Sequence, residues 1–203
     1  MPIFWRRIVI FVVSLIPFFL LIFKAIANHF GADPAKAIVL FTGTWAFYFL
    51  LITLSVSPLK KIVNQGWLMV HRRMLGLFTL FYAVLHMLTY LIFILGFNFS
   101  SFGSELVKRP YILLTIPAVI LLIILGATST QGMMRKLGKN WVKLHKSIYL
   151  VAILAWLHVL LQVRSSYADA VLFGVLTVCL LGIRLYWFLN KRFANKNLTP
   201  VKK

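Results

Sequence analysis

Histidine is the residue type of this chain whose chemistry and spacing best suggest a site. The 203-residue sequence has five histidines, His29, His71, His86, His145 and His158. It has three acidic residues, Asp33, Glu105 and Asp169. A neutral imidazole nitrogen is a strong ligand for iron and other transition metals. Ligation of a metal or a metal-containing cofactor by histidine is therefore the chemistry to test first.

Two pairs of histidines fall at matching positions of two apolar segments. His71 and His86 lie 15 residues apart, and His145 and His158 lie 13 residues apart, which is about 20 Å along a helix. Two helices that each carry histidines about four turns apart are typical of stacked b-type haems, because two imidazoles saturate a low-spin iron and the flat macrocycle fits between helices. The spacing predicts one level at His86 and His158 and a second at His71 and His145.

The rotation about the helix axis fits the two helices unequally. Fifteen residues leave His71 and His86 only about 60° away from a common face of their helix. Thirteen residues rotate an ideal helix by about 220°, so His145 and His158 would face the same side only with tilt or a local distortion. His71 is alternatively an interfacial residue, and His29 is expected at the outer boundary. A mid-helix histidine can also simply hydrogen-bond a neighbouring helix. We expect one b-type haem between His86 and His158, with His145 as an alternative or second-site ligand and His71 as a further candidate for a second haem.

The elements that position these histidines are predicted to be membrane helices. Hydrophobic residues make up 62% of the chain and charged residues 12%, and the mean hydropathy is +0.93. Soluble domains carry about 45–50% apolar and about 25% charged residues. We predict an all-α integral membrane protein, a six-transmembrane-helix bundle forming a single haem-binding domain over residues 1–203. The expected helices are Ile8–Asn28, Ile38–Val56, Met74–Phe97, Tyr111–Thr128, Leu144–Val163 and Ala170–Leu189.

The net charge of +19 predicts the orientation of this bundle. Sixteen basic residues fall on one side, at Arg6, Arg7, Lys60, Lys61, Arg72, Arg73, Arg135, Lys136, Lys139, Lys143, Lys146, Lys191, Arg192, Lys196, Lys202 and Lys203. By the positive-inside rule, both termini are cytoplasmic. Arg184 is expected to extend to the same side. All three acidic residues then lie outside, which leaves no carboxylate within the membrane. A basic surplus can also indicate nucleic-acid binding, but these cations lie between apolar segments, so no nucleic-acid partner is expected.

The N-terminal segment allows a second interpretation. Arg6-Arg7, the apolar stretch after it and Ala25-Ile26-Ala27 resemble a signal peptide with its cleavage site. We expect the segment to remain as the first helix, because it has helix length and the following loop fits an outer connection.

The single cysteine, Cys179, lies mid-helix and is expected to be a small buried residue.

Short motifs follow one another in a fixed order from about residue 30 to residue 190. They are Gly31-Ala32-Asp33-Pro34, Phe41-Thr42-Gly43, Arg72-Arg73-Met74-Leu75-Gly76-Leu77, Arg109-Pro110-Tyr111, Ser129-Thr130-Gln131, Arg135-Lys136-Leu137-Gly138-Lys139 and Leu144-His145, together with His86 and His158. In this order they resemble the MsrQ family, the haem-binding membrane subunits of the bacterial protein-methionine-sulfoxide reductase system, within the ferric-reductase-like transmembrane superfamily.

This resemblance implies haem ligation by His86, His145 and His158, and it does not extend to His71. It also implies flavin mononucleotide (FMN), respiratory quinol as an electron source, and a bacterial inner (plasma) membrane location. The implied partner is a periplasmic molybdenum-cofactor reductase that repairs methionine sulfoxide in oxidised proteins. The chain would then be an electron-transfer subunit of an oxidoreductase complex whose catalytic site lies on the partner. The acceptor would dock on loops 29–37, 98–110 and 164–169.

A basic rim on the cytoplasmic side offers a place for anionic groups of such cofactors. Arg72, Arg73 and Arg135 could hold haem propionates or a flavin phosphate through forked donors, although the positive-inside rule alone also accounts for them. The chain shows no glycine-rich dinucleotide fingerprint.

Two other functions remain open from the residues alone. A small membrane transporter is disfavoured because no carboxylate lies in the membrane and the halves show no evident repeat. A non-redox membrane anchor that recruits a periplasmic enzyme would give a colourless preparation. The absorption spectrum of purified protein distinguishes these alternatives from an electron-transfer subunit.

Overall fold

The computed structural model describes residues 2–163 and 167–197, and over these residues the chain is helical without strands. The long helices are α1 (Ile3–Ile26), α2 (Pro34–Val63), α3 (Trp67–Thr89), α5 (Tyr111–Ala127), α8 (Ile148–Gln162) and α9 (Ala168–Asn197). The short ones are a π-helix η1 (Tyr90–Ile94), a 3-10 helix η2 (Phe99–Ser101), α4 (Phe102–Lys108), α6 (Gln131–Leu137) and α7 (Lys139–His145). Lys202 and Lys203, which entered the charge argument, and residues 164–166 of the predicted docking loop lie outside the described residues.

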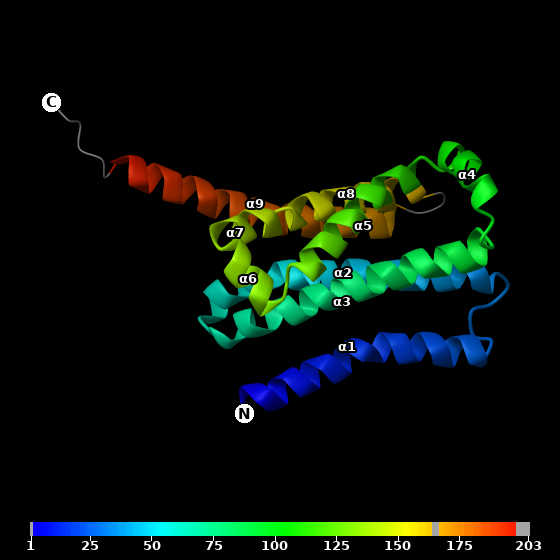
Figure 1. Ribbon diagram of the computed structural model, residues 1–203, viewed down its shortest axis with the longest axis horizontal. Coiled ribbons are helices and arrows are strands. Elements are labelled where there is room, and N and C mark those ends of the chain that lie inside the picture. Colours follow the sequence, from blue (N-terminus) through cyan, green and yellow to red (C-terminus); the bar gives the residue numbers. More distant parts are fainter. Residues whose placement is uncertain (1, 164–166, 198–203) are drawn as a thin grey trace.

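The prediction of an all-α, multi-pass membrane protein is confirmed. Five helices of the described chain are long and apolar enough to cross a membrane: α1, α2, α3 with the first part of η1, α7 with α8, and α9. The helix pair α4 and α5, bent by 114° at its break, makes a sixth candidate span. The long helices run side by side, with α4 at one end of the bundle and α6 and α7 at the other (Figure 1).

Several helices differ from the expected bounds. The helices α2 and α9 are 30 residues each, longer than the apolar stretches within them, because polar residues at their ends continue the helix beyond the apolar part. At its start, α2 is capped by the Asp33 side chain, which accepts a hydrogen bond from the Lys36 amide at 3.0 Å. The third span begins at Trp67 rather than at Met74. An apolar run thus marks where a helix lies in the membrane, but not where the helix ends.

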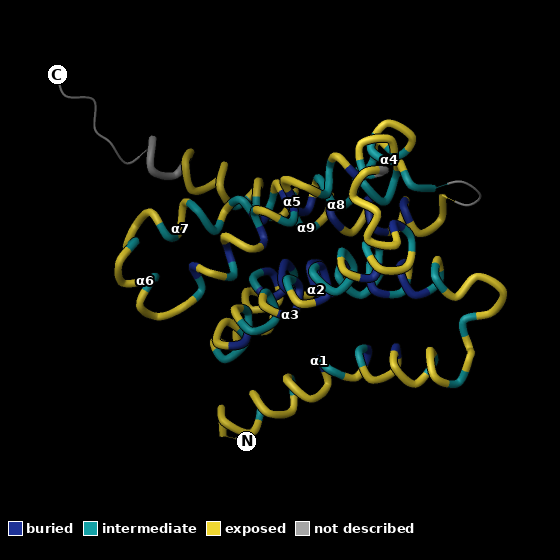
Figure 2. Tube along the Cα trace, turned by 45° about the vertical axis from the view of Figure 1, so that its right-hand side comes forward, coloured by how far each residue is buried: buried dark blue, intermediate teal, exposed yellow. Residues whose placement is uncertain are grey.

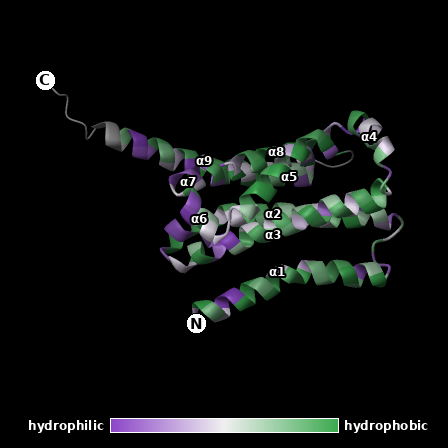
Figure 3. Cartoon of the chain, viewed as in Figure 1, coloured by the Kyte–Doolittle hydropathy of each residue, from purple (hydrophilic) through white to green (hydrophobic). Residues whose placement is uncertain are grey.

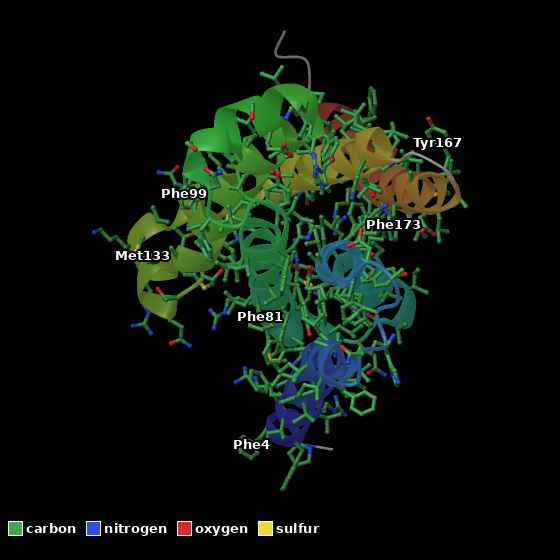
Figure 4. All side chains as sticks on the ribbon, turned by 90° about the vertical axis from the view of Figure 1, so that its right-hand side faces the viewer. Phe4, Phe81, Phe99, Met133, Tyr167 and Phe173 are labelled. Carbon is green, nitrogen blue, oxygen red and sulfur yellow. The ribbon has the colours of Figure 1, made fainter. Side chains whose placement is uncertain are left out.

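The pair α2 and α3 forms the centre of the bundle, and α5 packs along α8. The core between these helices includes Leu54, Val151 and Ala152, which are almost fully inaccessible. Phe173 of α9 stacks on Phe47 of α2 with ring centroids 4.6 Å apart, and Figure 4 shows Phe173 pointing toward α2. Buried residues gather where α2, α3, α5 and α8 face one another, whereas α1 along one edge is mostly exposed (Figure 2).

Large apolar side chains cover much of the outer surface of the bundle. Phe19 of α1 and Val178 of α9, for example, are 62% and 63% exposed. Green, hydrophobic segments run along the spans, whereas purple, hydrophilic residues concentrate around α6 and the helix ends (Figure 3). A surface of this kind is stable only against lipid, since contiguous apolar patches of this extent are rare on proteins in water.

Two residues of α9 depart from expectation. Arg184 is half-buried, because its guanidinium donates to the carbonyl oxygens of Leu54 and Leu180, the latter at 3.3 Å. Cys179 is exposed rather than buried, because it lies on the side of α9 away from the core. Both differences arise from the rotation of α9 about its axis, which hydropathy alone does not define.

Candidate functional site

The structure brings His86 of α3 and His158 of α8 together. Their ring centroids lie 6.3 Å apart, and the ring planes are inclined by 73°. Each histidine lies nineteen residues after the first residue of its span, Trp67 and Lys139 respectively, which is a rise of about 28 Å in each helix. The expectation that these two residues share a level is therefore confirmed. That level is near the end of the bundle that carries α4.

Each of the two imidazoles is oriented by a backbone carbonyl. The Nδ1–H of His86 donates to the carbonyl oxygen of Val39 in α2 at 2.9 Å, and the Nδ1–H of His158 donates to that of Tyr111 in α5 at 3.0 Å. Because a carbonyl oxygen can only accept, the proton of each neutral ring lies on Nδ1 and the lone pair lies on Nε2. Metal-binding histidines are usually held in this way, with the second ring nitrogen donating to a carbonyl or carboxylate.

Gly43 allows α2 to approach the His86 ring closely. A Cβ atom built at this position would lie 2.9 Å from Cε1 and 3.0 Å from Nδ1 of His86, which is closer than Cβ atoms normally approach other atoms. Any larger residue here would push the ring away from α2. The orientation of His86 therefore depends on a glycine that the sequence analysis placed only within a motif.

Two threonines join α2 and α3 next to the His86 ring. The hydroxyls of Thr42 and Thr89 lie 3.1 Å apart, and Thr89 also donates to the His86 carbonyl at 2.9 Å. Thr42 is 3.4 Å from His86 Nδ1. Both threonines are buried. The signal that could have found them is the occurrence of small, hydroxyl-bearing residues at matching depth in two otherwise bulky helices, where interhelical hydrogen bonds are common.

The donor set of this pair suits a haem better than a bare metal ion. An imidazole nitrogen binds a metal at about 2 Å and lies about 1.2 Å from its ring centre, so two axial imidazoles have centres about 6.4 Å apart. The observed separation of 6.3 Å matches this value. No group of three or more His, Cys, Asp or Glu side chains that could hold a metal ion occurs among the described residues. A haem needs only two axial ligands, because the porphyrin supplies the other four nitrogens.

His145, at the end of α7, lies in a different environment. Its Nε2 is 3.2 Å from the Thr128 hydroxyl, and its ring stacks on Trp141 with centroids 4.0 Å apart. The indole N–H of Trp141 in turn donates to the Thr128 carbonyl at 2.9 Å. A break at residues 146–147 separates α7 from α8, so a local distortion lies between His145 and His158.

His71 is buried within the protein rather than exposed at the interface. Its exposed fraction is 2%, and neither ring nitrogen has a hydrogen-bond partner. The Trp67 ring lies edge-on at 5.8 Å, and the Arg6 guanidinium covers that indole at 4.8 Å. In the part of the chain that the structure describes, no ring contact or hydrogen bond joins His71 with His145. The predicted second pair is thus not assembled as the first is.

The remaining candidate residues lie at the two ends of the bundle. His29 is exposed in the turn after α1, as expected, with its ring 6.0 Å from that of Phe23. Arg73 of α3 donates to the sulfur of Met134 in α6 at 3.1 Å. Arg135 is exposed on α6, and the charge of Arg72 acts on His145. The arginines therefore share the end that holds His145, away from the pair of His86 and His158.

A polar cluster covers that pair at the opposite end of the bundle. The Tyr111 ring lies 5.5 Å from that of His158, and the charges of Glu105 and Arg109 act on the Tyr90 hydroxyl, which is buried without a hydrogen-bond partner. Arg109 forms an ion pair with Glu105 at 3.0 Å. Tyr90 was a candidate from the sequence, as an aromatic residue that could line a cofactor pocket or anchor the helix at the membrane interface. Sequence reasoning did not identify Glu105 as a site residue, because α4 is too short and polar to be recognised from its hydropathy.

Comparison with known proteins places these residues in a family context. Residues 42–156 match the family model described as ferric reductase like transmembrane component. The chain is also 38% identical, over 192 residues, to the protein-methionine-sulfoxide reductase heme-binding subunit MsrQ of Herminiimonas arsenicoxydans. The matched region covers 93% of this chain and 88% of that protein. His86 lies within the family match, whereas His158 lies two residues beyond it.

Proposed function

The chain belongs to the ferric-reductase-like transmembrane family, and from that premise we propose that it is the haem-binding electron-transfer subunit of a protein-methionine-sulfoxide reductase. The family match and the similarity to MsrQ support a membrane electron-transfer role. The observation that carries the proposal is the pair of adjacent imidazoles, His86 and His158, each oriented by a backbone carbonyl. Haem b, when bound, supplies an iron that cycles between its ferric and ferrous states by single electrons.

The residues around the pair would hold and tune this cofactor. The carbonyls of Val39 and Tyr111 keep Nε2 of each ring available for iron and increase the basicity of both ligands. More basic imidazoles favour the ferric state, which lowers the reduction potential and makes the reduced haem a better electron donor. Gly43 leaves room for the ring of His86 in that position.

The charge distribution of the chain supports an orientation of the bundle, and with it a direction for the proposed electron route. With both termini cytoplasmic by the positive-inside rule, the pair of His86 and His158 lies toward the periplasmic side, beneath α4. We propose that a periplasmic molybdenum-cofactor reductase docks on the outer segments, which include α4, and receives electrons there. Quinol in the inner membrane, or FMN bound near Arg72, Arg73 and Arg135, would supply them. The resemblance to MsrQ supports this partner and these donors.

Absorption spectroscopy of detergent-purified protein tests the proposal. We expect reduced-minus-oxidised bands of a bis-imidazole b-type haem in the wild type and their loss in His86→Ala and His158→Ala. His29→Ala is the matched control, because it removes an exposed imidazole at the same end of the bundle. A colourless wild type, or full spectra in both pair variants, would refute the proposal.

The number of haems is a separate question that the same material answers. Haem extracted per polypeptide would be one if only the His86 and His158 pair binds it, and two if His145 holds a second. In the second case His145→Ala removes one haem and leaves the other. Applying the same measurement to His71→Ala tests whether the buried, unpartnered imidazole of His71 takes part.

A further inference from the structure

The half-buried guanidinium of Arg184 is held between α2 and α9 by a carbonyl group that a proline in α2 leaves without a partner. Pro58 has no N–H, so the carbonyl oxygen four residues earlier, that of Leu54, loses its intrahelical partner. Arg184 donates to this carbonyl and also lies over the Tyr149 ring, 5.2 Å from its centroid. Leu54 is fully buried. The arginine therefore has a fixed position that depends on a proline 126 residues away in the sequence.

Among the described residues, the positive charge of Arg184 has no carboxylate near it to balance it. Asp169 lies in the first turn of α9, about 20 Å along that helix from Arg184. Asp33 precedes α2 and lies still further along α2 from Leu54, the residue that Arg184 contacts. Glu105 belongs to α4, and its carboxylate forms an ion pair with Arg109. The charge of Arg72 acts on Arg184 and has the same sign. An unbalanced arginine within a membrane helix is costly and is by default functional.

A second cation lies on the same boundary between α2 and α9, nearer to the helix ends. The Lys61 ammonium of α2 lies 3.5 Å from the centre of the Trp187 ring of α9. Trp187 is three residues after Arg184, about 5 Å further along the helix. We define the α2/α9 seam as Leu54, Lys61, Arg184 and Trp187. The seam thus presents a guanidinium and an ammonium and, among its own members, no acidic group.

We propose that the α2/α9 seam binds the phosphate of an anionic phospholipid from the leaflet at the C-terminal ends of these two helices. Arginine offers forked donors that match phosphate oxygens, and lysine adds a point charge. Basic pockets between membrane helices on the cytoplasmic side typically bind anionic head groups. Phe188 of α9, one turn after Arg184 and on the same side of the helix, is 54% exposed and suits an acyl chain.

The exposed Phe188 side chain favours a lipid over a free ion. Inorganic phosphate would gain only the two charges, whereas a phospholipid also places its chains on the exposed face of α9. The proposal is independent of the haem-binding function, because the seam lies on α2 and α9 at the end of the bundle away from His86 and His158.

Native mass spectrometry of the full chain tests the proposal with phosphatidylglycerol as the probe and phosphatidylcholine as the neutral reference. Lys61→Gln should weaken phosphatidylglycerol binding about five-fold, since one basic residue near an anionic surface contributes about that factor. Lys24→Gln is the matched control, because Lys24 also lies over an aromatic ring, that of Phe41, but toward the other end of the bundle. We expect Lys24→Gln to bind as the wild type does.

Further outcomes decide whether the seam binds a lipid, a free ion or neither. Equal affinity for the two lipids in the wild type, or equal losses in the two lysine variants, would overturn the proposal. Displacement of phosphatidylglycerol by millimolar inorganic phosphate would assign the seam to a free ion instead. In Arg184→Gln, a changed haem spectrum in phosphatidylcholine would assign the arginine to the cofactor. An unchanged spectrum with lost lipid preference supports the lipid site, and Lys61→Gln keeps the test valid if Arg184→Gln does not fold.

Discussion

Replacing Gly43 by alanine perturbs the candidate haem site through a single methyl group. The added Cβ would lie 2.9 Å from Cε1 and 3.0 Å from Nδ1 of His86, where ordinary contacts begin at 3.4 Å. The imidazole must therefore move away from α2 by about 0.5 Å. Because Val39 belongs to the same helix as Gly43, this movement also lengthens the hydrogen bond from Nδ1 to the Val39 carbonyl.

The movement of the ring should weaken haem binding far more than it lowers the unfolding free energy. The bond of 2.9 Å would reach about 3.4 Å, beyond the usual limit of about 3.2 Å for N–H···O bonds. Its loss costs about 0.5–1.5 kcal/mol of stability, and alanine in place of glycine within a helix returns about 0.5–1 kcal/mol. The unfolding free energy should thus change little. Loss of such a supporting hydrogen bond to a metal ligand typically weakens metal binding about 10- to 100-fold.

The assay is a titration of haem-free protein with haemin in detergent, followed by absorbance, with the helical circular dichroism signal as the measure of folding. Gly76→Ala is the matched control, because it lies in the same bundle and its added Cβ would meet Thr53 at an ordinary 3.7 Å. We expect wild-type affinity for Gly76→Ala and at least ten-fold weaker binding for Gly43→Ala. Wild-type haem affinity in Gly43→Ala, with an unchanged reduction potential, would refute the reasoning.

Three other substitutions have defined expectations. In the wild-type background, Arg184→Gln should lower the unfolding free energy by about 1–3 kcal/mol, because the buried Leu54 carbonyl loses its donor. In a Pro58→Ala background the loss should be markedly smaller, because the backbone N–H of the alanine can donate to that carbonyl within α2. A denaturation cycle measures this coupling, and additive effects would contradict it. Thr42→Val should lower the unfolding free energy by about 0.5–1.5 kcal/mol, because it removes the hydroxyl that contacts Thr89. Thr44→Val is the control in the same denaturation assay, because the Thr44 hydroxyl donates only within its own helix. Tyr90→Phe should leave stability unchanged or raise it by up to about 1 kcal/mol, because the buried hydroxyl has no partner, and a clear loss of melting temperature would show that it has one.

The pairing of His86 with His158 could be predicted from the sequence because it depends on two regular quantities. Membrane helices must begin near the same boundary, and each residue adds a constant rise, so equal positions along two helices give equal depth. The apolar runs also identified the long helices, since their composition is unlike that of any soluble element.

The partners of the two histidines could not be predicted, because they depend on how each helix is rotated about its axis. The carbonyls of Val39 and Tyr111 accept from the rings only after α2 and α5 have packed against α3 and α8. The same holds for Arg184, whose partner is determined by Pro58 and by the approach of α9 to α2. Short polar helices such as α4 and α6 carry no apolar period and were missed for that reason.

Holding a ligand by main-chain atoms has a consequence for how this protein can change over evolutionary time. Every amino acid has a carbonyl oxygen, so substitutions at Val39 and Tyr111 can alter the side chains without removing the acceptors that orient His86 and His158. Mutational drift at these two positions is therefore expected to be tolerated as long as the helices keep their places. The constraint is transferred to Gly43, where a single added carbon matters, and variation among descendants of this sequence should be narrow there.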